Sequence, residues 1–155
     1  MKTIEIKAFR KGMETVIYQL IKKVYDDFVA VDYSDNGNLF FYNWIQPSKI
    51  ALRQEIQNNL WVAYDEKRMV GMIEIRENKN ISLLFVDKEY QGQGIARMLF
   101  QVALNISFER DPCLKTYYVH ASPFSIPIYE KLGFVAQDEM KIEHGIKYLP
   151  MEMQL

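Results

Sequence analysis

The chain has 155 residues, of which 49% are hydrophobic and 25% charged, a balance typical of a single globular domain, here residues 1–155. Its formal net charge of −1 gives no electrostatic reason to expect nucleic acid or a membrane surface as a partner. The single cysteine, Cys113, cannot form an intrachain disulfide, and no apolar run approaches the roughly 20 residues of a membrane span, so we expect a cytoplasmic protein.

The first third of the chain is predicted to hold a strand and a long helix. Residues Thr3–Phe9 alternate between polar and apolar side chains, which predicts the strand. From Gly12 to about Val31 the apolar residues recur at spacings of three and four, which predicts an amphipathic helix. Asp32–Asn38 is a polar break rich in turn formers, and the aromatic segment Leu39–Ile45 that follows has no regular period.

A second helix and a hairpin follow in the middle of the chain. A helix is predicted from Pro47 to about Gln57, with Ser48 as its N-cap. Leu60–Tyr64 and Met69–Arg76 are predicted as two strands, which the intervening charged turn joins as a hairpin.

The rest of the chain is organised around the stretch from Ser82 to Phe108. The apolar segment Ile81–Val86 predicts a buried strand, and the charged turn Asp87–Tyr90 follows it. Next comes the glycine-containing loop Gln91–Ala96, after which apolar residues at helical spacing predict a helix of roughly four turns.

The C-terminal part is predicted to alternate between strands and one short helix. Thr116–Ala121 is predicted as a strand, and Phe124–Leu132 as a helix that Gly133 ends. Phe134–Met140 and Ile146–Met153 are predicted as the last strands. The order of elements indicates a mixed α/β fold.

The strand, loop and helix around Gly92 and Gly94 have the arrangement of a phosphate site. Glycines let a ligand approach the backbone closely, and the first N–H groups of a helix have no partner inside it. Those donors and the helix dipole favour a diphosphate oxygen. The loop lacks the ATP-binding pattern, and it lacks the dinucleotide pattern because Arg97 stands where a third glycine is required.

Two motifs resemble the GNAT N-acetyltransferase superfamily. The acyl-CoA loop of that family reads Gln/Arg-x-x-Gly-x-Gly/Ala, which Gln91, Gly94 and Ala96 match. The block from Tyr129 to Phe134, Tyr-Glu-Lys-Leu-Gly-Phe, is similar to one that these enzymes carry after the CoA-binding helix. Both motifs occur in the family's order and at a separation that suits one helix and one strand.

The resemblance implies a fold, a cosubstrate and a set of site residues. The fold would be a mixed, mostly antiparallel sheet of about seven strands flanked by about four helices, with the strands splayed where acetyl-CoA binds. Tyr129 would protonate the departing thiolate, and Ser122 stands where the family usually has asparagine. The residues implied in acetyl-CoA binding are Phe85, Val86, Gln91, Gly92, Gln93, Gly94, Ile95, Ala96, Ser122, Ser125 and Tyr129.

The general base is left open. Many relatives carry a glutamate on the fourth or fifth strand, where this chain has Asn80 and Tyr117. Glu74 is one candidate because it interrupts an apolar run on the third strand, although a glutamate on the solvent face of a strand is the more common explanation. His120 is another, because its pKa suits proton transfer near neutral pH, although a surface position without a catalytic role is the more common explanation. A chain of water molecules to bulk solvent is a third alternative.

The expected function is acetyl transfer from acetyl-CoA to a primary amine by direct attack in a ternary complex, without a metal. We expect a small-molecule amine as the acceptor, no nucleic-acid or membrane partner, and a monomer or homodimer. The alternatives are a protein or peptide amine as the acceptor, or an acyl-CoA sensor of the same fold that does not turn over. Aromatic residues gather between Tyr25 and Trp44, and we hypothesise that a subset including Tyr42 and Trp44 lines the acceptor pocket.

Overall fold

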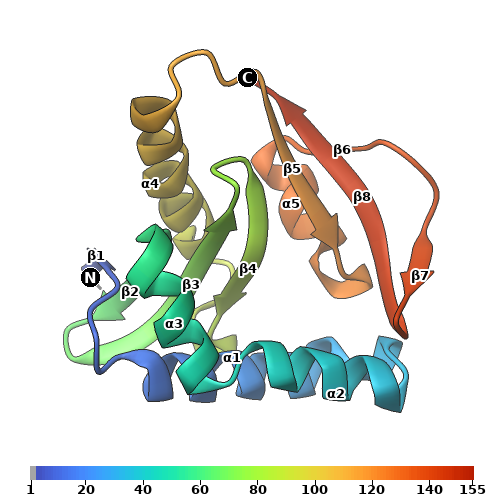
Figure 1. The fold of residues 1–155 in the computed structure, drawn as a ribbon, viewed down its shortest axis with the longest axis horizontal. Helices are drawn as coiled ribbons and strands as arrows, with labels where there is room; N and C mark the ends of the chain where they lie inside the picture. The colour runs from blue at the N-terminus through green and yellow to red at the C-terminus, as the bar shows by residue number, and fades with distance from the viewer. Residues whose placement is uncertain (1–2) are drawn as a thin grey trace.

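The computed structural model describes residues 3–155 as a mixed sheet with helices on both faces (Figure 1). This part of the chain holds eight strands: β1 (Ile4–Ala8), β2 (Leu60–Asp65), β3 (Arg68–Arg76), β4 (Asn80–Val86), β5 (Thr116–Ala121), β6 (Val135–Ala136), β7 (Lys141–Glu143) and β8 (Ile146–Gln154). It also holds five α-helices: α1 (Glu14–Phe28), α2 (Asp35–Trp44), α3 (Pro47–Gln57), α4 (Ile95–Arg110) and α5 (Ile126–Leu132). Three short 3₁₀ turns complete it: η1 (Ala30–Asp32), η2 (Lys88–Tyr90) and η3 (Pro123–Ser125).

The order of strands in the sheet is β1-β2-β3-β4-β5-β8-β6, and β7 pairs with β8. Among the described residues every strand pair is antiparallel except β4 with β5, which run parallel because α4 connects them as a crossover. The predicted mixed α/β fold is confirmed, with one strand and one helix more than expected. None of the helices in residues 3–155 is long and apolar enough to cross a membrane.

The sheet separates between β4 and β5. These strands pair only where Asn80 meets Tyr118 and where Ile81 meets Val119. The register between β3 and β4 shifts at Ser82, and such a bulge bends the strand. Beyond this point β4 and β5 diverge, as Figure 1 shows. The expected splaying is therefore present, and one edge of β4 has no strand beside it.

Two hydrophobic cores lie on opposite faces of the sheet. On one face Leu99 and Phe100 of α4 pack against strand residues that include Tyr117. On the other face Ile17 and Ile21 of α1 pack against residues that include Leu83 of β4. The two cores hold α4 and α1 on either side of β4, so both helices border the gap that opens beside this strand.

The region predicted as a polar break and an aperiodic stretch is instead helix α2. Ser34 caps this helix, because its Oγ accepts a hydrogen bond from the Gly37 N–H at 3.0 Å. Leu39 and Phe40 are exposed on α2, whereas the ring of Phe41 is half-buried, so the helix has no broad apolar face. The periodicity of the sequence therefore did not predict helix α2, because its first residues are polar and its aromatic residues do not form one apolar face.

Two further boundaries differ from the predictions. Pro47 is the first residue of α3 and Gln46 is its N-cap, so the predicted cap, Ser48, lies within the first turn. The predicted strand Phe134–Met140 pairs only at the two residues of β6, an exposed strand at the edge of the sheet. The strand is short because it lies at the edge of the sheet, where it pairs with a single neighbour, β8.

Candidate active site

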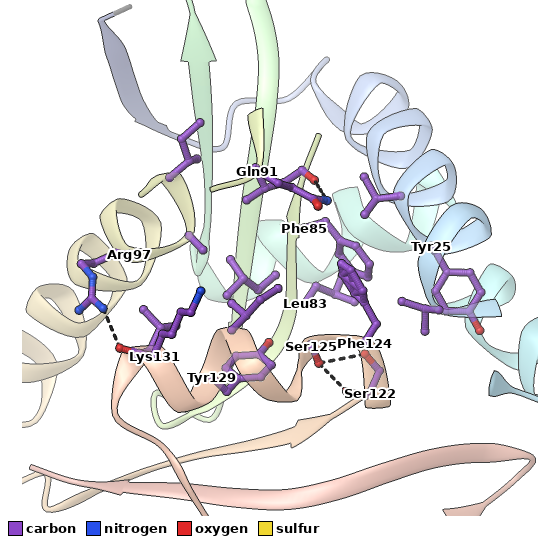
Figure 2. A pocket seen from close by; sticks show the side chains of 18 of the residues that line it. Tyr25, Leu83, Phe85, Gln91, Arg97, Ser122, Phe124, Ser125, Tyr129 and Lys131 are labelled. Carbon is purple, nitrogen blue, oxygen red and sulfur yellow. Dashed lines mark hydrogen bonds between the residues drawn. The ribbon is translucent and has the colours of Figure 1, made fainter. Parts of the chain in front are cut away.

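A pocket of about 440 Å³ lies where β4 and β5 separate (Figure 2). Its walls come from β4, the loop before α4, the end of β5, α5, and the region of α1 and α2. The residues singled out from the sequence that line it are Phe85, Val86, Gln91, Gly92, Gly94, Ile95, Ala96, His120, Ser122, Ser125 and Tyr129. Gln93 and Glu74 are not among the lining residues.

The loop before α4 presents backbone donors at one end of the pocket. Gly92 and Gly94 have φ angles of 78° and 82°, which L side chains rarely adopt, and the space beside both Cα atoms is open. Gly94 is the N-cap of α4, and its carbonyl accepts from the Met98 N–H at 3.0 Å. The N–H groups of residues 95–97 precede that bond and have no partner inside the helix. This end of the pocket therefore suits an anion.

Two cationic side chains stand beside these donors. Arg97 and Lys131 line the pocket, and both residues are exposed. The Arg97 guanidinium donates to the Lys131 carbonyl at 2.7 Å, which ties the first turn of α4 to the end of α5 (Figure 2). Neither residue was predicted, although the place of Arg97 one residue past the loop motif could have suggested it. Their charges add to the attraction of this end for phosphate.

Gln91 braces the loop against β4. Its Nε2 donates to the carbonyl of Val86, one of the residues implied in acetyl-CoA binding, at 3.1 Å, so this carbonyl already has a partner. From Ser82 onward the same edge of β4 has no strand partner in β5. Gln91 thus fixes the path of the loop. The rest of this edge of β4 stays open to the amide groups of a ligand.

Tyr129 forms part of the wall opposite β4. The residue is only 5% exposed, and within residues 3–155 no group hydrogen-bonds its hydroxyl, which Figure 2 shows directed into the pocket. Burial raises the pKa of this phenol above its ordinary value, so the hydroxyl stays protonated at neutral pH. Its ring packs edge-on against Phe134, with ring centroids 5.6 Å apart, which fixes the orientation of the phenol.

Two serines shape the turn that leads into α5. The Oγ atoms of Ser122 and Ser125 lie 2.9 Å apart, and the Ser125 hydroxyl also lies 2.9 Å from the Ser122 carbonyl. The Ser125 N–H donates to the same carbonyl at 2.9 Å. The serine that replaces the family's asparagine is therefore engaged within its own turn, at the edge of the pocket.

The far end of the pocket is aromatic. Tyr25, Tyr33 and Phe41 line it, and the rings of Tyr25 and Phe41 stack with centroids 3.9 Å apart. Phe124 lines the other wall and stacks on Phe28 at 4.6 Å, so α1 meets the turn before α5 at this point. An apolar or aromatic group is the natural occupant of such a surface.

Tyr42 and Trp44 do not line this pocket. The Tyr42 hydroxyl donates to Asp26, and Trp44 stacks on the Arg53 guanidinium at 4.2 Å. The prediction that these two aromatic residues line the pocket is therefore wrong, whereas other members of the same aromatic cluster do line it.

His120 is an exposed residue of β5 that lines the pocket near Ser122. Its ring stacks on Tyr148 of β8, with centroids 4.3 Å apart. Partial burial and the positive charge of Arg76 lower its pKa, so the imidazole is neutral at pH 7. Tyr117 lies on the opposite face of the sheet, where its hydroxyl is 3.0 Å from the Ser107 Oγ. Of these two β5 residues, His120 is the one that reaches the pocket.

Glu74 lies in a buried polar network instead. It is 2% exposed, which contradicts the solvent-face explanation of its place in the strand. The Arg53 guanidinium donates to its carboxylate at 3.0–3.2 Å, and the Gln54 amide donates to it at 2.6 Å. This network joins α3 to β3 and accounts for the polar residue in an apolar run.

The ion pair of Glu74 and Arg53 predicts a large effect on stability. Glu74→Ala would leave the partly buried guanidinium of Arg53 without its carboxylate, and we expect the free energy of unfolding to fall by about 3 kcal/mol. Urea titration measures this quantity. The double variant Arg53→Met/Glu74→Leu is the control, because an apolar pair should restore most of the loss. A Glu74→Ala protein of unchanged stability that lacks activity would contradict this structural role.

Comparison with known sequences identifies the family. A sequence model of the acetyltransferase (GNAT) domain matches residues 29–155. A peptidyl-lysine N-acetyltransferase, YjaB of Salmonella typhimurium, is 29% identical over 93 residues, which are 59% of this chain and 61% of that protein. The matched region thus spans about three fifths of the length of this curated relative. Because the family model covers most of the chain, the protein belongs to the acetyltransferase (GNAT) family, a family of acyltransferases, as the two motifs predicted.

Solved structures share the fold over the whole chain. A GCN5-related N-acetyltransferase from Rhodopseudomonas palustris has a TM-score of 0.84 at 19% identity and covers 100% of this chain and 98% of its own. The PaiA N-acetyltransferase of Thermoplasma acidophilum, solved in complex with coenzyme A, has a TM-score of 0.77 at 17% identity and covers 99% of each chain. At these identities the similarity establishes the fold alone.

Proposed function

We propose that the protein is an N-acetyltransferase that transfers the acetyl group of acetyl-CoA to a primary amine. The observation that carries this proposal is one pocket that extends from the glycine loop before α4, past the unpaired edge of β4, to Tyr129 and His120. Residues 1–155 would act as a single domain, since the two motifs meet in this one pocket. The fold alone would not carry the proposal, because a fold hosts many functions.

The residues of the pocket fit coenzyme A. The N–H groups of residues 92–96 would hold the diphosphate, with Arg97 and Lys131 adding positive charge. The open edge of β4 would bond the amide groups of the pantetheine arm, as an added strand does. The complex of the PaiA N-acetyltransferase with coenzyme A, in the same fold, supports this choice of ligand.

Bound acetyl-CoA supplies an activated acetyl thioester. The nitrogen of the acceptor forms a bond to the thioester carbon while the bond from that carbon to sulfur breaks. Tyr129 would give its hydroxyl proton to the departing thiolate, since this hydroxyl is protonated, points into the pocket and has no partner among residues 3–155. The backbone donors along β4 would stabilise negative charge on the carbonyl oxygen.

His120 is the residue that would accept the proton from the amine, directly or through water. A primary amine is almost wholly protonated near pH 7, because its pKa is about 10. The lowered pKa of His120 keeps its imidazole neutral and ready to accept a proton at that pH. His120 would lose this capacity only as the pH falls through its lowered pKa, below the ordinary value of about 6.5.

A small-molecule amine is the acceptor that the pocket favours. The contact between Phe28 and Phe124 narrows the aromatic end of the pocket. The Ser34 N–H donates to the Gly145 carbonyl at 3.0 Å, and this bond holds α2 against the turn between β7 and β8. A lysine side chain of a peptide is the second candidate, because the similar YjaB protein of Salmonella typhimurium is a peptidyl-lysine N-acetyltransferase. Thiol release from acetyl-CoA with free amines and with a lysine peptide would separate the two.

Thermal unfolding in the presence of acetyl-CoA tests the donor site. At 100 times its dissociation constant a ligand adds about 2.7 kcal/mol to the free energy of unfolding, so we expect the melting temperature to rise by a few degrees. NAD and ATP serve as controls and should cause no comparable rise. If a folded sample free of copurified coenzyme A shows no rise with acetyl-CoA, the proposed donor site is wrong.

A further inference from the structure

A second, smaller cavity adjoins the pocket at His120. It has a volume of about 120 Å³ and is lined by Arg76, Asn80, Ile81, Ser82 and His120. Ser82 and His120 line the main pocket as well, so the two cavities meet at these residues. A molecule that occupies the small cavity would therefore have one end beside the site where the acetyl group is transferred.

The strand register places the polar residues of this cavity on one face of the sheet. Asn80 is the partner of Arg76 on β3 and of Tyr118 on β5, and directly paired residues point to the same side. His120 lies two residues beyond Tyr118 on β5, so it points to that side too. The cavity is thus bounded by side chains of three neighbouring strands at the place where β4 and β5 begin to separate.

Arg76 gives the small cavity a positive charge, and no ion pair engages it within residues 3–155. No hydrogen bond or ion pair engages its guanidinium within residues 3–155, whereas Arg53 and Arg68 are both paired with carboxylates. No aspartate or glutamate is among the described residues that line the cavity. Burial and then the charge of Arg76 lower the pKa of the His120 imidazole, whereas Glu143 raises it, so charges of both signs act on this residue.

The chemistry of the cavity suits a carboxylate. A guanidinium binds a carboxylate through two parallel hydrogen bonds, and the Asn80 amide and the Ser82 hydroxyl are further donors in reach of the same space. A volume of about 120 Å³ is enough for a carboxylate and a short part of its chain. A second amine at the same place would be repelled by Arg76, which disfavours diamines.

We propose that this cavity anchors the acceptor, and that the acceptor is an amine that also carries a carboxylate, held by Arg76 while its amino group lies at His120. The inference rests on the proposed N-acetyltransferase function and narrows its substrate class. Arg76 then determines specificity and does not take part in proton transfer. A bound carboxylate would also offset the charge of Arg76 near His120, which strengthens the imidazole as a base.

Matched pairs of acceptors test the proposal. Each ω-amino carboxylate from β-alanine to 6-aminohexanoate is compared with the alkylamine in which a methyl group replaces the carboxylate. We expect kcat/KM for the best amino carboxylate to exceed that of its alkylamine by about tenfold or more. Arg76→Gln should reduce this ratio by a similar factor, and calorimetry should show weaker binding of the amino carboxylate to the free protein.

Lys79→Gln is the matched control, since Lys79 is an exposed cation near the cavity that does not line it. It should leave the preference for the carboxylate intact. The proposal is overturned if the wild-type protein prefers alkylamines or diamines, if no amino carboxylate is acetylated, or if Arg76→Gln leaves the ratio unchanged. Acetylation of another amine by the same samples would show that only the acceptor inference has failed. If no amine is acetylated, or if acetyl-CoA causes no rise in melting temperature, the proposed function itself is removed.

Discussion

Gly94→Glu is expected to abolish the binding of acetyl-CoA. The backbone at Gly94 has a φ of 82° and caps α4, and a side chain there would extend into the open space in front of the helix N-terminus. A glutamate would put bulk and negative charge where the proposal places the diphosphate, and would neutralise the attraction of the helix dipole. The rise in melting temperature with acetyl-CoA should disappear.

Gly12→Glu is a matched control for this variant. Gly12 also has a positive φ, of 108°, has open space beside its Cα and does not line the pocket. Both variants place a side chain at a positive φ and add the same charge, and each should lose about 1–2 kcal/mol of stability. Only Gly94→Glu should lose the response to acetyl-CoA. An unchanged affinity for acetyl-CoA in folded Gly94→Glu protein would show that the loop is only a turn.

Tyr129→Phe is expected to lower kcat by roughly a hundredfold or more, which is the usual contribution of a positioned general acid. The phenyl ring keeps the packing against Phe134, so the protein should fold and bind acetyl-CoA as before. The loss arises because no proton reaches the departing thiolate. Steady-state thiol release measures kcat, and the melting temperature with acetyl-CoA reports binding separately.

Tyr117→Phe provides the control for loss of a buried hydroxyl. Tyr117 is fully buried, and its hydroxyl is paired with Ser107 on the face of the sheet away from His120. Its removal should cost about 1 kcal/mol of stability and leave kcat unchanged. If the two variants lose kcat to the same extent, the effect at Tyr129 is a general consequence of disturbing the fold, and its role as an acid is wrong.

The sequence predicted most of the fold because its strands and main helices carry regular patterns. The helical spacing of Ile17 and Ile21 and the turn at Gly133 correspond to elements that the structure contains. Helix α2 was not predicted because Leu39 and Phe40 face solvent. Its apolar residues therefore do not recur at the spacing of a buried helix face. The cap of α3 was misplaced because Pro47, rather than Ser48, occupies the first helical position.

The site was predicted less completely, because the motifs describe the chain locally and the pocket joins distant segments. The glycine loop and Tyr129 follow from two short motifs. Tyr33 and Arg97 line the same pocket without belonging to either pattern. Glu74 shows the opposite error, since an isolated charge in an apolar strand can indicate catalysis or a buried ion pair. Only the position of Arg53, on a helix that packs against this strand, distinguishes them.

The narrow junction of β4 and β5 has a mechanical consequence. Two residue pairs join the halves of the sheet, and beyond them the halves touch through contacts such as that of Phe28 with Phe124. A ligand bound between β4 and β5 would connect the two halves of the sheet at a junction where few backbone hydrogen bonds join them. Contacts between the two halves that lie away from the reacting atoms, such as the one that Phe28 makes, would then affect how readily a ligand leaves without altering the chemical groups.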